Sequence, residues 1–167
     1  PGMGTNAAFA LATQCYKTLM ADGRKAKQAC DMNIVTPALE NIIEANILLS
    51  GLGFESGGLA AAHGIVDGLT ILPGTHKYMH GEEVAFGTLC HMMLENAPTE
   101  ELEEVLDFCL DVGLPVCLAD IGVESISPEE LRQVAEKASI PEESTHAMPF
   151  PVNAQTVAAA IVAADKL

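Results

Sequence analysis

The sequence predicts an all-α fold of about eight helices, and three observations support this. Hydrophobic residues make up 49% of the 167 positions but aromatic ones only 4%, so Ala, Leu and Met fill most apolar positions, and these residues favour helices. Apolar residues recur at helical spacing in several segments. The enrichment in β-branched and aromatic residues that is typical of strands is missing. A single helical domain spanning residues 1–167 is expected, long enough to bury a core.

Three helices are predicted before residue 51. Thr5 and Asn6 can cap a helix over residues 7–21, which Gly23 is expected to break, and a short helix follows over residues 25–33. Thr36 and Pro37 supply a cap and a first-turn proline for a helix over residues 37–50.

Residues 51–95 contain a glycine-rich stretch followed by two very apolar segments. Four glycines between residues 51 and 58 predict a turn or a close backbone approach. Ser56 can cap a helix over residues 57–68, which is apolar enough to be buried on most sides. A loop over residues 71–79 then leads into an apolar helix over residues 80–95.

Three further helices are predicted after residue 97. The first begins at Pro98 and Thr99, has an acidic first turn that suits the helix dipole, and ends at the Gly-Leu-Pro run 113–115. A connector over residues 118–123 precedes a helix that starts at Ser127 and ends near residue 139. After a proline-containing loop over residues 141–151, Asn153 caps a last helix that reaches Lys166.

Charge and cysteine content narrow the class of protein. A formal charge of -15 disfavours nucleic acid and anionic membrane surfaces as partners. The five cysteines form no CxxC pair, so we expect small buried thiols in a reducing, cytoplasmic setting. No apolar run reaches the roughly 18 residues of a membrane span and no signal peptide is visible. The opening Pro-Gly-Met-Gly suggests a piece of a longer chain.

Two histidines are candidate metal ligands. His63 lies in the most apolar predicted helix and His80 begins the next one, and neutral imidazole is a common ligand of zinc and iron. Each could instead be a core histidine with a satisfied hydrogen bond, and the spacing alone favours that alternative because no HExxH unit is present. His76 forms a metal-binding HxxxH pair with His80 only if both share a helix.

Asp67 opens a second hypothesis. It follows His63 by four residues on the same helical face, so His63, Asp67 and His80 could form a local metal-binding set with an open position that activates water, as in a hydrolase. For His76, His91 and His146 we expect structural or surface roles. A non-catalytic helical assembly domain is the third alternative.

Several of these segments resemble a known family. Residues 51–63 (GLGFESGGLAAAH) and 80–89 (HGEEVAFGTL) are similar to those of glycerol dehydrogenases, in the iron-containing or group III alcohol dehydrogenase family. Residues 35–46 (VTPALENIIEAN) and 146–149 (HAMP) resemble it too, so the similarity spans essentially the whole chain. Val66 stands where the family often has a second His, and Asp67 where it commonly has Asn.

The resemblance implies a two-domain enzyme of the dehydroquinate synthase-like fold, with only the C-terminal helical half present here. The absent N-terminal α/β domain would bind NAD. Zinc, with Fe2+ as the second choice, would be held by His63, His80 and an Asp expected upstream of Pro1. Phe54 matches an aromatic wall of the substrate pocket.

The resemblance also implies an activity and a set of partners. The activity is NAD-dependent oxidation of glycerol to dihydroxyacetone, with the metal ion polarising the substrate hydroxyl for hydride transfer. The partners are a small polyol, the N-terminal domain of the same protein and further copies in a homo-oligomer. The fragment alone is expected to be inactive.

Overall fold

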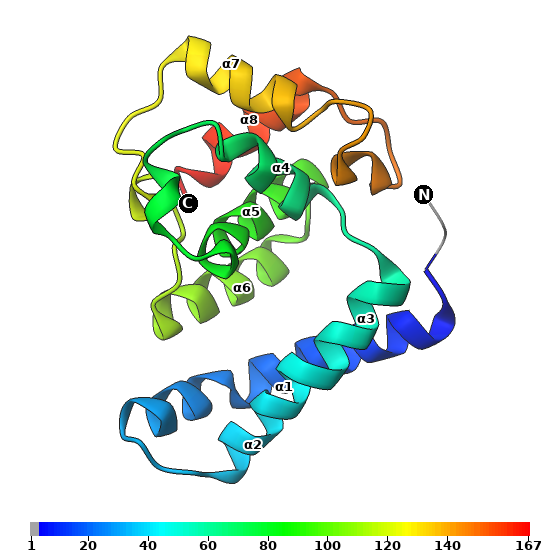
Figure 1. The fold of residues 1–167 in the computed structure, drawn as a ribbon, viewed down its shortest axis with the longest axis vertical. Helices are drawn as coiled ribbons and strands as arrows, with labels where there is room; N and C mark the ends of the chain where they lie inside the picture. The colour runs from blue at the N-terminus through cyan, green and yellow to red at the C-terminus, as the bar shows by residue number, and fades with distance from the viewer. Residues whose placement is uncertain (1–3) are drawn as a thin grey trace. The chain divides into compact units, whose positions relative to one another are not determined.

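The computed structural model describes residues 4–167, and every regular element in this range is helical. It contains eight α-helices, one π segment and three 3-10 turns (Figure 1). The predicted all-α fold class is therefore confirmed. The chain separates into two compact units, which join at Gly58 and Leu59; the single helical domain expected over residues 1–167 stays a prediction. The division falls at the Gly57-Gly58 pair, where Gly58 takes φ 80° and ends the helical path.

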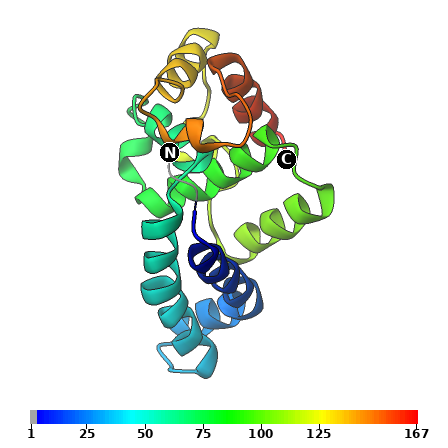
Figure 2. The same ribbon diagram turned by 90° about the vertical axis from the view of Figure 1, so that its right-hand side faces the viewer.

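Unit 1, up to Gly58, is a helical hairpin. Helix α1 (Asn6–Asp31) packs along α2 (Pro37–Glu44), the π segment Ala45–Leu49 and α3 (Ser50–Gly57) (Figures 1 and 2). The predicted break at Gly23 is wrong, because α1 runs through it and buries it. Glycine costs a helix only about 1 kcal/mol, and its lack of a side chain permits close packing. Of the two alternatives predicted for residues 51–58, a turn is absent up to Gly57, where α3 ends, and a close backbone approach is present at Gly53.

Small residues form the interior of unit 1, and large ones lie outside. A side chain at Gly53 would lie 3.5 Å from the backbone nitrogen of Ala12, so α1 and α3 approach closely. The other buried positions are also small, namely Ala8, Gly23, Ala26, Ala29 and Ala45. Phe9 and Ile47 are 76% and 68% exposed. This hairpin buries helix backbone and leaves an apolar outer surface.

Unit 2, Leu59–Leu167, contains the larger core. Its helices are α4 (Ala61–Leu69), α5 (His80–Leu94), α6 (Thr99–Val112), α7 (Pro128–Lys137) and α8 (Ala154–Ala164). The 3-10 turns are Thr75–Lys77, Ala119–Ile121 and Ser144–Ala147. Helix α4 begins at Ala61 rather than at residue 57 as predicted, because the residues before Gly58 belong to α3. The remaining helices of unit 2 start within a residue of their predicted positions.

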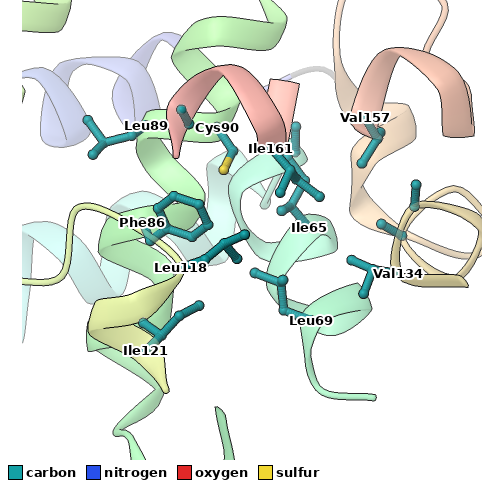
Figure 3. Close-up of a cluster of buried hydrophobic side chains, with 14 of the residues drawn as sticks. Ile65, Leu69, Phe86, Leu89, Cys90, Leu118, Ile121, Val134, Val157 and Ile161 are labelled. Carbon is teal, nitrogen blue, oxygen red and sulfur yellow. The ribbon is translucent and has the colours of Figure 1, made fainter. Parts of the chain in front are cut away.

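Helix α5 is the centre of unit 2. It packs against α4, α6 and α8, and Phe86, Leu89 and Cys90 on it are fully buried. Figure 3 shows these side chains meeting others from α4, α7, α8 and the 118–121 segment. The contributing residues are Ile65, Leu69, Leu118, Ile121, Val134, Val157 and Ile161. The apolar character predicted for the 57–68 and 80–95 segments thus corresponds to the central α4–α5 pair.

Side-chain caps fix the helix starts that the sequence predicted. The side chains of Thr5, Thr36, Ser127 and Asn153 each accept a backbone N–H from the first turn that follows. Such a cap satisfies a donor that the helix itself leaves unpaired. The helix starts therefore follow local chemistry that is visible in the sequence.

The expected burial of the cysteine thiols is confirmed in part, and the helix lengths in the described part of the chain agree with the expected lack of a membrane span. All five cysteines are free thiols, and Cys90 and Cys109 are buried, but Cys30 is exposed on α1 and does not fit the predicted burial. In the part of the chain that is described, none of the helices combines the length and the apolar character needed to cross a membrane.

Replacing Gly68 by Ala is expected to destabilise unit 2 by about 1–3 kcal/mol. The added methyl group would lie 2.5 Å from the carbonyl oxygen of Val134 and 2.8 Å from Cβ of Ala138, so α4 and α7 must move apart. Gly81→Ala is the control, because no atom lies within 4 Å of its added methyl group. Urea unfolding of both variants measures the difference. Equal unfolding midpoints would contradict the close α4–α7 approach.

Candidate metal centre

His63 is held in the first turn of α4. The carbonyl oxygen of Ala60 accepts the backbone N–H groups of His63 and Gly64 at 3.2 and 3.3 Å. The same oxygen accepts the Ser144 hydroxyl at 3.0 Å, which ties the 3-10 turn Ser144–Ala147 to the start of α4. His63 itself is half-buried. Its backbone position is therefore determined by contacts from a segment some 80 residues further along the chain.

His80 is the first residue of α5. The Glu82 carboxylate accepts the backbone N–H of Met79 at 2.8 Å, and the Glu82 and Glu83 N–H groups are bonded to the Met79 carbonyl. These bonds close the first turn of the helix. The His80 side chain is exposed. A regular helix start thus carries an accessible imidazole.

The fold brings the two predicted ligands together. The ring centroids of His63 and His80 lie 5.4 Å apart, with ring planes inclined at 46°. Two imidazoles on one tetrahedral zinc ion have ring centres about 5 Å apart, because the Zn–N bond is about 2.0–2.1 Å. The observed spacing fits two ligands of a single ion. It also argues against two unrelated core histidines, the alternative that spacing along the chain favoured.

The environment of His63 favours its neutral form. Burial lowers the pKa of the His63 imidazole, and the neighbouring His80 lowers it further, while the Asp67 carboxylate partly opposes both effects. Only a neutral imidazole offers a ring nitrogen lone pair to a metal. The donor chemistry of the pair therefore suits a transition-metal ion.

Asp67 is not part of a ligand set with the histidines. Its side chain is exposed, and its pKa is raised by partial burial and by the neighbouring Glu143 carboxyl group. Lys137 Nζ donates to Glu143 Oε1 at 2.9 Å. Among residues 4–167 no three His, Cys, Asp or Glu side chains converge as a metal-binding group. The predicted local set of His63, Asp67 and His80 is therefore not formed, because Asp67 does not converge with the two imidazoles.

The other histidines have separate local partners. His76 lies in a 3-10 turn with Nε2 2.8 Å from the Thr70 carbonyl oxygen, so it shares no helix with His80. His91 is half-buried on α5, with Nε2 3.6 Å from a Glu95 oxygen. His146 Nε2 lies 3.0 Å from the Ser139 carbonyl oxygen. These contacts agree with the structural and surface roles expected for them.

Two kinds of residue around the imidazole pair were not identified from the sequence. Gly87 brings α5 against α4, since a side chain there would lie 2.6 Å from the Ala62 carbonyl oxygen. Ser144 and the buried Thr145 support α4 from the other side. Gly87 could have been noticed in the sequence as a glycine inside an apolar helix. No local sequence signal marks Ser144 or Thr145. Phe54 is exposed on α3 in unit 1, and its role as a pocket wall stays a prediction.

Comparison with known proteins places the chain among dehydrogenases. A glycerol dehydrogenase of Thermotoga maritima is 53% identical over 164 residues, which is 98% of this chain and 45% of that protein. Glycerol dehydrogenase of Escherichia coli O6:H1 is 51% identical over 165 residues. No protein-family model matches the sequence. The chain thus spans a little under half the length of the curated relatives that it matches.

A solved structure has the same fold. The crystal structure of a probable glycerol dehydrogenase from Sinorhizobium meliloti 1021 matches 98% of this chain with a TM-score of 0.93 and 50% sequence identity, and the match covers 46% of that chain. Sequence and fold therefore agree over nearly every residue. The chain belongs to the glycerol dehydrogenase family and corresponds to the C-terminal helical part of its members.

Proposed function

We propose that this chain is the metal-binding half of an NAD-dependent polyol dehydrogenase that oxidises glycerol to dihydroxyacetone. The observation that carries the proposal is the 5.4 Å spacing of the His63 and His80 rings. Zinc is the proposed ion, with Fe2+ as the second choice, because a borderline-soft ion with imidazole ligands suits the pair. The names of the relatives support the substrate class.

In the proposed reaction the role of this chain is to bind the metal ion and to fix its position. His63 and His80 hold the ion from two adjacent helices whose backbones are packed together, so the imidazoles cannot separate freely. The chemistry that such an ion supplies when bound is Lewis-acid polarisation of a substrate hydroxyl, which favours hydride transfer to NAD. The buried residues of α4 and α5 limit access of water from within unit 2.

Other parts of the proposed site lie outside these 167 residues. Two imidazoles leave a metal site incomplete, and no third ligand joins them among residues 4–167. We propose that an Asp of an upstream domain supplies it and that the same domain binds NAD, since relatives are about twice as long as this chain. The exposed apolar residues of unit 1, such as Phe9 and Ile47, suit contact with that domain or with other copies in a cytoplasmic homo-oligomer.

Replacing His63 or His80 by Ala in the full-length protein is expected to remove the bound zinc and to lower kcat/KM for glycerol by about 100-fold or more, because several kcal/mol of transition-state stabilisation are lost. His146→Ala is the matched control, since that imidazole is exposed and lies against the Ser139 backbone carbonyl rather than beside His63 and His80. Elemental analysis and steady-state kinetics measure both effects. Full zinc content in His63→Ala and His80→Ala would refute the metal site.

Replacing Asp67 by Ala separates the dehydrogenase from the hydrolase alternative. Zinc content is expected to be unchanged, because the exposed Asp67 carboxylate does not converge with the two imidazoles. Elemental analysis of the full-length variant beside wild type provides the test. Loss of zinc would support the local set of His63, Asp67 and His80.

The isolated 167-residue chain is expected to show no NAD-linked glycerol oxidation. It supplies two imidazoles but no third ligand among its described residues, so zinc binding should be weak. Absorbance of NADH at saturating glycerol, with added zinc, measures turnover. Sustained NADH formation by the fragment would mean that the proposed division of the site between two domains is incorrect.

A further inference from the structure

Two segments pack closely against the backbone of helix α4, one on each side. On the α5 side, a side chain at Gly87 would lie 2.6 Å from the Ala62 carbonyl oxygen and 2.9 Å from Cγ2 of Val66. On the opposite side, a side chain at Gly64 would lie 2.9 Å from both the backbone nitrogen and Cγ2 of Thr145. Neither gap has room for an extra carbon atom. Helix α4 therefore cannot move away from α5 without pressing on the segment behind it.

Gly87 lies in register with both candidate ligands. It follows His80 by seven residues on α5, which is two helical turns and places both on one face. The atom that it meets on α4 belongs to Ala62, the residue before His63. The contact at Gly87 thus sets the distance between α5 and the turn of α4 that carries His63, two turns along α5 from His80. Metal ligands need positions accurate to within about 0.5 Å.

We propose that Gly87 is a positioning residue for the imidazole pair, because its missing side chain sets the distance between α4 and α5 and so the spacing of His63 and His80. The inference rests on the proposed metal site. Gly87 contacts neither substrate nor ion in this account and acts only through the Ala62 carbonyl and Val66. Val66, where the family often has a histidine, is fully buried and serves as the packing surface opposite Gly87.

The experiment compares Gly87→Ala with wild type in the full-length protein. The dissociation constant of zinc, measured by competition with a chromophoric chelator, is expected to rise about tenfold or more, as when other residues that orient metal ligands are changed. The visible absorption bands of the cobalt(II)-substituted protein are expected to shift, because they report ligand geometry. A residue with a purely structural role would change neither quantity.

Two controls isolate the positioning effect. Thr88→Ala alters the next residue on α5, whose hydroxyl bonds the Val84 carbonyl of its own helix at 2.8 Å, and should leave zinc affinity unchanged. Val157→Ala removes a fully buried side chain on α8 and should lower stability while zinc affinity and the cobalt spectrum stay the same. If Gly87→Ala weakens zinc binding no more than Val157→Ala, the proposal is overturned.

A graded variant covers the case in which Gly87→Ala does not fold. Val66→Ile adds a single methyl group to the side chain opposite Gly87, so it should shift the cobalt spectrum and weaken zinc binding in the same direction by a smaller factor. An unchanged spectrum and affinity in Val66→Ile would overturn the proposal. Zinc retained by His63→Ala would instead refute the metal site itself. Zinc lost in His63→Ala but bound normally by Gly87→Ala would refute the positioning role alone.

Discussion

The close approach of α4 to its neighbours is the constraint on which the rest of unit 2 depends. Gly87 allows α4 to pack closely on α5, and Gly68 allows α4 to pack closely on α7. At both glycines the neighbouring helix is too near for a side chain to fit. Tight contact of helix backbones leaves few alternative arrangements, because packed interiors cannot absorb an added methyl group. The core residues of Figure 3 then surround this helix from α5, α7 and α8. The short, glycine-containing helix α4 is thereby held between close neighbours on several sides.

That confinement accounts for the imidazole pair. His63 and His80 belong to different helices, and neither is hydrogen-bonded to the other, yet their rings lie 5.4 Å apart. The spacing comes from the packing of α4 on α5 and from the Ser144 bond to the Ala60 carbonyl. Burial keeps the pKa of His63 low and its ring neutral. A packed helix pair with two imidazoles at one end supplies the two nitrogen donors of the proposed metal site.

Unit 1 is packed differently from unit 2, whose core consists of large buried side chains. Small residues are buried between its helices, and large apolar ones such as Phe9 and Ile47 are exposed. Burial of large side chains is the main source of stability in small domains, so a hairpin of this kind is stabilised mainly when another surface covers it.

The sequence by itself determined the helical fold class and most helix starts, because caps, periodicity and composition act over a few neighbouring residues. It also marked His63 and His80 as candidate metal ligands. It overestimated the effect of glycine: Gly23 and residues 51–57 are inside helices, since glycine disfavours a helix by only about 1 kcal/mol. It also offered Asp67 as a third ligand from its helical spacing. Only the tertiary structure decided that Asp67 does not converge with the two imidazoles and that Gly87 meets Ala62, because these arrangements depend on how separate helices pack, beyond the reach of any local pattern.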